Sequence, residues 1–171
     1  MTGSRSYKPK ARLVSTVVAR VDTDRLDDFA VLLGEYQREV EALAGYVGFE
    51  PDTELTRERL DAMLSMPDYG AFIAQTPKGH LLGFCALFPM PVGLREERFA
   101  ILDRLYVRPE FRRSGVARQL VAEAKRFAKS CKCQRLQATL PAAFPLDSAE
   151  AFFDAEKFYR TGGRKHKIAL G

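Results

Sequence analysis

Two long stretches of the chain place apolar residues at steps of three and four, which is the spacing of one helix face. The first ends near Gly45, and its apolar positions are Leu26, Phe29, Leu33, Tyr36, Val40 and Leu43. The second runs from about Gly115 to Lys129, and its apolar face holds Ala117, Leu120, Val121, Ala124, Phe127 and Ala128. Shorter helices are predicted over residues 53–65, before Pro67, and over residues 148–155.

Runs rich in β-branched and aromatic residues separate these helices and predict strands. They cover residues 12–21, 70–75, 80–88, 98–107 and 135–140, and the end of the chain carries a last strand. A Thr-Pro-Lys-Gly turn joins the second and third runs, and residues 89–93 form the next connection. The order combines an antiparallel meander with a strand–helix–strand crossover. It therefore predicts a mixed sheet in an α/β protein of the α+β type.

Length and composition fit one globular domain. The 171 residues suffice for a sizeable core, and 46% hydrophobic with 29% charged residues is ordinary for a soluble protein. Residues 1–10 are polar and are interpreted as a disordered leader, followed by a single domain over residues 11–171. No membrane is expected as a partner, because no apolar run reaches spanning length and no signal peptide is recognisable.

The three cysteines, Cys85, Cys131 and Cys133, form no even disulfide framework. The Cys-Lys-Cys pair is too tight and too isolated for a zinc site, so no metal is expected. Cys85 lies in an apolar run and is interpreted as a buried small hydrophobe. This cysteine usage favours a reducing compartment, and we expect a cytoplasmic protein.

The segment 112–117, Arg-Arg-Ser-Gly-Val-Ala, lies between a predicted strand and the second long helix. A helix start leaves backbone N–H groups without intrahelical partners, and the helix dipole is positive there. With two arginines and a small Gly115, this segment favours a phosphate ligand. It lacks the Gly-Lys-Ser/Thr of a Walker A loop and the three glycines of a dinucleotide fingerprint.

Residues 105–117, Leu-Tyr-Val-Arg-Pro-Glu-Phe-Arg-Arg-Ser-Gly-Val-Ala, resemble the acetyl-CoA-binding motif of the GNAT N-acetyltransferase superfamily. Arg112 takes the Arg/Gln place of that motif, Gly115 its inner glycine and Ala117 its last small position. Arg113 stands where the family often has glycine. The predicted order of elements from about Arg12 to Leu170 also fits the family.

The resemblance implies acetyl-CoA as cosubstrate and a fold with a mostly antiparallel sheet of six to seven strands. About four helices would cover both faces, and the pantetheine arm would lie between splayed strands four and five. The residues implied in cofactor binding are Leu105, Tyr106, Val107, Arg112, Arg113, Ser114, Gly115, Val116, Ala117, Arg118 and Phe153. A backbone N–H near Tyr106 or Val107 would bind the thioester oxygen.

Acetyl transfer to an amine by direct attack needs a neutral amine, so a general base is expected. Asp103 is the candidate, on the fourth strand and, by alternation, on the same face as Leu105. The competing interpretation pairs Asp103 with Arg104 or with an arginine of a neighbouring strand. Glu96, Glu97 and His80 are further options, at a hairpin end and after a turn.

Many relatives place a general-acid tyrosine late in the fourth helix, in a segment like A-x-x-F-Y-x-x-x-G-F. In one alignment Ala155, Phe158, Tyr159 and Gly163 match, and Tyr159 is the acid. In the other, Ala149, Phe152, Phe153 and Phe158 match, so that Phe153 replaces the tyrosine and Lys157 the glycine. The second leaves more of the tail for a terminal strand.

These observations predict an N-acetyltransferase acting on the primary amine of a small molecule or peptide, with the acceptor unidentified. The alternative is a CoA-binding regulatory or vestigial module with little turnover, which loss of the tyrosine would favour. A nucleic-acid partner is not expected, because 27 basic against 22 acidic residues is a modest excess and interleaved aromatics are lacking. The resemblance makes a homodimer an expectation.

Overall fold

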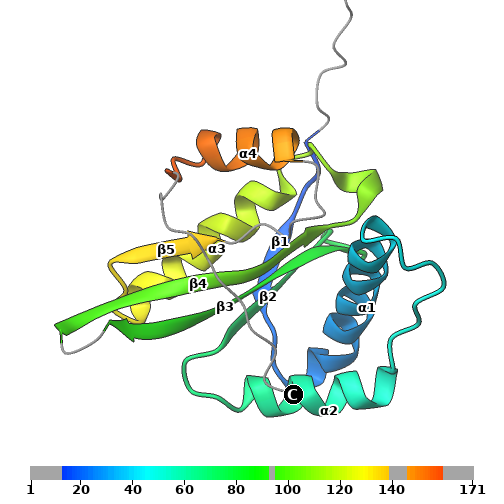
Figure 1. Ribbon diagram of the computed structural model, residues 1–171, viewed down its shortest axis with the longest axis horizontal. Helices are drawn as coiled ribbons and strands as arrows, with labels where there is room; N and C mark the ends of the chain where they lie inside the picture. Colours follow the sequence, from blue (N-terminus) through cyan, green and yellow to red (C-terminus); the bar gives the residue numbers. More distant parts are fainter. Residues whose placement is uncertain (1–12, 93–94, 139–145, 160–171) are drawn as a thin grey trace, which may run out of the picture.

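The computed structural model describes residues 13–92, 95–138 and 146–159, and within them five strands form one sheet in the order β1-β2-β3-β4-β5. The first four strands are antiparallel, whereas β4 and β5 are parallel (Figure 1). The bounds are β1 Val17–Arg20, β2 Gly70–Gln75, β3 Leu81–Val92, β4 Arg95–Val107 and β5 Arg135–Ala138. The predicted mixed, mostly antiparallel sheet is therefore confirmed.

In the described part of the chain, four α-helices cover the two faces of the sheet, with α1 and α2 on one face and α3 and α4 on the other (Figure 1). Their bounds are α1 Leu26–Leu43, α2 Thr53–Leu64, α3 Val116–Ser130 and α4 Leu146–Ala155. The Asp52 side chain caps α2 by accepting a hydrogen bond from the N–H of Leu55, 2.9 Å. Within the described part of the chain, no helix has the length and apolar character needed to cross a membrane.

Strand alternation divides the core into two clusters, one on each face of the sheet. From β2, Phe72 and Ala74 join the cluster under α3, while Ala71 and Ile73 join the cluster under α1 and α2. Cys85 lies under α3 and is fully buried, as predicted for a small hydrophobe.

The strand count differs from the six to seven predicted. Five strands lie within the described residues, and the expected terminal strand falls on residues 160–171, outside them. β3 is longer than predicted, because Pro89 and Pro91 pair with Ala100 and Arg98 of β4 instead of forming a connection. β2 begins at Gly70, opposite Leu87, so the part of β3 beyond Leu87 pairs only with β4. A proline, which has no N–H, is tolerated on a strand that is paired on one side only.

Two irregularities shape the C-terminal half of β4. Opposite Ala86 and Leu87 of β3 stand Arg104 and Leu102, so Asp103 is the extra residue of a β-bulge. Within the described residues, the last pair of β4 with β5 is Leu102 with Ala138. Beyond it, residues 103–107 of β4 have no β5 partner within the described residues.

Gly83 allows β3 to approach the C-terminal half of β4 closely. A Cβ at Gly83 would lie 2.2 Å from the carbonyl oxygen of Tyr106, a backbone atom that cannot turn away. We expect Gly83→Ala to lower the free energy of unfolding by about 3 kcal/mol, the upper end for overpacking. Chemical denaturation measures this loss.

Gly79→Ala is the control, because Gly79 has φ +87° and open space around it. Its left-handed strain alone should cost only about 1 kcal/mol. Equal losses in the two variants would show that the close approach at Gly83 is not limiting.

Candidate active site

The loop before α3 presents a row of backbone donors. Gly115, at the helix start, has φ +90°, and Arg113 has φ +61°, so both adopt left-handed conformations. The first backbone hydrogen bond of the helix runs from the N–H of Gln119 to the carbonyl of Gly115. Within the described residues, the N–H groups of residues 113–118 have no hydrogen-bond acceptor. Such a row, at the positive end of a helix dipole, suits an anion.

The side chains of this loop have other partners. Arg112 donates from Nε to the carbonyl of Val107, 2.9 Å, and from Nη2 to the carboxylate of Glu39 on α1, 2.7 Å. Ser114 is buried, and its hydroxyl donates to the carbonyl of Phe111. The guanidinium of Arg112 thus points towards α1, and the hydroxyl of Ser114 has an internal acceptor.

The remaining predicted cofactor residues of this region divide into exposed and buried ones. Arg113 and Arg118 are exposed, and Arg118 donates to Glu156 beyond α4, 2.8 Å. Val116, the first residue of α3, has a buried side chain, while Ala117 is half-buried. The loop therefore offers backbone N–H groups and the arginines at 113 and 118 to an anion.

Residues 103–107 of β4, which have no β5 partner within the described residues and are called the open edge here, adjoin this loop. The N–H of Arg108 donates to the carbonyl of Leu82 on β3, 2.9 Å. Since successive residues of a strand point their N–H groups to opposite sides, those of Leu105 and Val107 point away from β3. The edge can therefore bind an extended ligand that carries amide groups.

The backbone of Tyr106 points towards β3, unlike that of Leu105 and Val107. Its backbone carbonyl points towards β3, and its ring packs against Phe84 and Tyr36 with centroid distances of 6.0 Å. Burial raises the pKa of the Tyr106 hydroxyl to about 12, and the carboxylates of Glu35 and Glu39 add to the rise. This hydroxyl is therefore protonated at neutral pH.

The bulge turns Asp103 to the α1 face of the sheet. Leu102 and Leu105 both pack in the cluster under α3, so the two residues between them lie on the opposite face. Simple alternation predicted that Asp103 and Leu105 share a face. This prediction is wrong, because the extra residue of the bulge interrupts the period of two. Arg104 donates from Nη1 to Oδ2 of Asp103, which is the ion pair considered from the sequence.

Two tyrosines lie within electrostatic range of this pair. Burial raises the pKa of Tyr69 to about 12, with Arg104 lowering and Asp103 raising it. Burial likewise raises the pKa of Tyr36, under the same two opposing charges. Asp103 and Arg104 are about one-third exposed, at 35% and 33%, so solvent reaches the pair.

The other candidate bases lie elsewhere. Glu97 forms an ion pair with Arg135 of β5 at 3.9 Å. His80 is exposed in the turn before β3. The side chain of Glu96 falls outside the described part of the structure. Of the bases considered from the sequence, only Asp103 belongs to residues 103–107 of β4.

The end of α4 has the geometry of a Schellman motif. Lys157 adopts φ +64°, its N–H donates to the carbonyl of Asp154, and the N–H of Phe158 donates to that of Phe153. The rings of Phe153 and Phe158 lie 5.0 Å apart. A left-handed residue at 157 is the conformation that glycine favours, which matches the alignment with Phe153 in the tyrosine place. Tyr159 lies beyond the helix and is 76% exposed.

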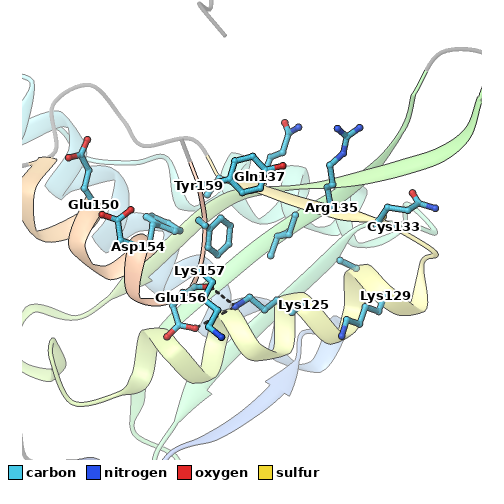
Figure 2. A pocket seen from close by; sticks show the side chains of 16 residues that line it. Lys125, Lys129, Cys133, Arg135, Gln137, Glu150, Asp154, Glu156, Lys157 and Tyr159 are labelled. Atoms are coloured by element: carbon cyan, nitrogen blue, oxygen red, sulfur yellow. Dashed lines mark hydrogen bonds and ion pairs between the residues drawn. The ribbon is translucent and has the colours of Figure 1, made fainter. Parts of the chain in front are cut away.

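A cavity of about 530 Å³ opens between α4, β5 and the second half of α3 (Figure 2). Phe153 and Tyr159 line it, whereas no residue of the loop before α3 does. Its charged lining is mixed, with Lys125, Lys129, Arg135 and Lys157 beside Glu150, Asp154 and Glu156. The cavity therefore lies apart from the loop before α3 and shares with the predicted site only Phe153 and Tyr159.

Two ion pairs that the sequence analysis did not find connect α1 to the end of β4. Glu35 accepts from Nε and Nη2 of Arg108, at 2.9 and 2.6 Å, and Glu39 pairs with Arg112. A signal was available, since both the acids on the helix and the arginines are spaced by four residues. Spacing alone does not reveal which segments meet in space.

Comparison with known proteins identifies the class. A model of the acetyltransferase (GNAT) family matches residues 32–159, which is most of the chain. The chain belongs to the GNAT family of acetyltransferases. No curated protein sequence matches it.

Solved structures share the fold at low identity. A probable acetyltransferase superposes with a TM-score of 0.74 at 23% identity, covering 91% of this chain and 98% of the other. An aminoglycoside acetyltransferase from an uncultured soil metagenomic sample, in complex with sisomicin, gives 0.71 at 18%, with 91% and 95% covered. A ribosomal-protein-alanine N-acetyltransferase from Brucella melitensis biovar Abortus 2308 gives 0.68 at 18%, with 91% and 100% covered. Such identities carry the fold and leave the acceptor open.

Proposed function

We propose that this protein transfers the acetyl group of acetyl-CoA to a primary amine by direct attack of the amine. The observation that carries the proposal is the meeting of two backbone features in a GNAT fold. The open edge of β4 at residues 103–107 adjoins the loop before α3, whose N–H groups have no acceptor within the described residues. A cosubstrate with an amide-bearing arm and a pyrophosphate fits both.

In this proposal, the N–H groups of residues 113–118 bind the pyrophosphate, and Arg113 and Arg118 add positive charge. Leu105 and Val107 hold the pantetheine arm by strand-like hydrogen bonds. Phe153 contributes an apolar contact from α4. The side chain of Arg112 has a different role, since its bonds to Val107 and Glu39 position the loop against α1.

Acetyl-CoA supplies an acetyl group already activated as a thioester. The amine nitrogen bonds to the carbonyl carbon as the carbon–sulfur bond breaks, and the CoA sulfur departs as a thiolate. Asp103 accepts the proton that the amine loses. The N–H of Val107 or Leu105, which point to the open edge, is the donor that stabilises negative charge on the thioester oxygen.

The leaving thiolate has no tyrosine from α4 in this proposal. Phe153 stands in the tyrosine place, and the thiolate departs unassisted or is protonated by water. A thiol of pKa about 8.5 is a far better leaving group than an alcohol, so this loss slows the reaction without abolishing it. Phe153 is also what favours the second candidate, a CoA-binding module with little turnover.

Gly115→Glu is expected to abolish acetyl-CoA binding, because it brings bulk and negative charge to the proposed pyrophosphate site. Calorimetric titration with acetyl-CoA and with CoA measures this loss. Gly79→Glu is the matched control, because Gly79 also has a left-handed φ, +87°, in open space. It should bind like the wild type. Undiminished binding to Gly115→Glu would refute the assignment of the loop.

Asp103→Asn is expected to lower kcat by about a hundredfold or more, the usual contribution of a general base. Raising the pH should restore part of the rate, because more of the amine is then neutral without help. Steady-state kinetics over a pH series tests both statements. Glu97→Gln, another carboxylate of β4, serves as the control and should retain the wild-type rate. A wild-type pH profile for Asp103→Asn would exclude Asp103 as the base.

Tyr159→Phe is expected to change kcat by no more than about twofold, far less than the hundredfold cost of losing a general acid. The reason is its position beyond α4, with its ring exposed. The measurement is turnover at saturating acetyl-CoA, with affinity for CoA determined alongside. A hundredfold drop at unchanged affinity would instead make Tyr159 the acid.

A further inference from the structure

Three carboxylates and three arginines face one another on the α1 side of β4. Asp103 pairs with Arg104, Glu35 with Arg108 and Glu39 with Arg112. These pairs match the carboxylates one to one with arginines. Both oxygens of Glu35 and of Glu39 accept from their arginines, whereas Asp103 accepts from Arg104 through Oδ2 alone.

Two of the pairs are closed structural contacts. Arg108 donates from Nε and Nη2 to Glu35 and from Nη1 to the carbonyl of Leu81. Arg112 donates to Glu39 and to the carbonyl of Val107. Each guanidinium is held by a carboxylate and a backbone carbonyl together, which gives both arginines a structural role.

The Asp103–Arg104 pair is different. Arg104 uses only Nη1, for Asp103, and its Nε and Nη2 groups have no acceptor within the described residues. The pair is about one-third exposed and lies at the β-bulge of β4. Guanidinium donors that have no acceptor at such a solvent-reached position can bind an anionic group.

We propose that the acceptor is an amine with a neighbouring carboxylate, of the α-amino acid class, and that Arg104 binds this carboxylate. The inference rests on the proposed acetyl transfer. An amino acid of this class carries a carboxylate and an ammonium group side by side. Its carboxylate can face Arg104 while its ammonium group faces Asp103. On binding, Nε and Nη2 of Arg104 donate to the ligand carboxylate, and Oδ1 of Asp103 accepts from the ligand ammonium group. The ammonium group then lies against Asp103, which the proposal above makes the base.

The same arrangement disfavours polycationic amines. An ammonium group that binds Asp103 without supplying a carboxylate places a second positive charge beside Arg104. Like charges brought together in a partly buried site are strongly unfavourable. The hydroxyls of the neighbouring Tyr36 and Tyr69 are protonated at neutral pH and supply no compensating negative charge.

The test measures release of CoA thiol with matched acceptors. The panel holds the common amino acids, the same amino acids as α-amides, a linear polyamine and an aminoglycoside. We expect kcat/KM for the best acid to exceed that for its amide by at least about tenfold, the effect of one charge-assisted contact. Arg104→Gln should lower kcat/KM about ten- to hundredfold more for the acid than for the amide, mainly through KM, because any effect through Asp103 is shared by both acceptors.

Arg104→Lys should retain part of the preference, because it keeps the charge without the planar fork. Arg126→Gln is the matched control, since Arg126 is an exposed residue of α3 paired with Glu123, and it should behave as the wild type. Calorimetry with acetyl-CoA and a thermal melt of each variant separate acceptor recognition from cofactor binding and folding.

The outcomes distinguish the two proposals. Wild-type protein that fails to bind acetyl-CoA refutes the acetyltransferase function itself. Protein that binds acetyl-CoA but turns over no carboxylate-bearing amine, or prefers amides or polyamines, overturns the acceptor class and leaves acetyl transfer standing. Equal losses on acid and amide in Arg104→Gln overturn the role of Arg104 in recognition.

Discussion

The candidate site depends on one irregularity in backbone pairing, the β-bulge at Asp103 where β4 pairs with β3. The extra residue interrupts the alternation of side chains along β4, so Asp103 and Arg104 both lie on the α1 face of the sheet. Beyond the bulge, Leu105 and Val107 point their N–H groups away from β3, and within the described residues these groups have no β5 partner. Under the proposed function, β4 therefore offers backbone donors to the pantetheine arm and a charged pair to the acceptor.

The arginines of this region stabilise the frame more than they serve the anion site. Arg108 and Arg112 bind both a carboxylate of α1 and a backbone carbonyl, which holds the helix against the last residues of β4. A guanidinium with several donors suits such a joint better than an ammonium would. Under the proposed function, backbone N–H groups form most of the anion site, with Arg113 and Arg118 adding charge, and backbone groups need no side-chain ordering when a ligand binds. Charge at this end of the sheet is therefore balanced pair by pair.

The sequence predicted those features that follow from local periodicity. The bounds of β2 and the extents of α1 and α3 were predicted because their apolar spacing is regular. The bulge at Asp103 was not, because it is a property of pairing between two strands and leaves no mark on β4 alone. Pro89 and Pro91 predicted a connection, yet β3 runs on, since its outer edge there requires no donors. The ion pairs of α1 were visible only as a spacing, without the fold that brings them to β4.

Lys157 shows how the end of α4 and the chemistry of the site are connected. A lysine in a left-handed conformation costs about 1 kcal/mol, and a glycine there would avoid that cost. The two Schellman hydrogen bonds and the contact of Phe153 with Phe158 offset it. A tyrosine at position 153 would need a partner for its hydroxyl in this half-buried aromatic group, whereas phenylalanine packs there without one. Under the proposed function the site gives up a proton donor where it is needed least, because the departing thiolate is already a stable anion.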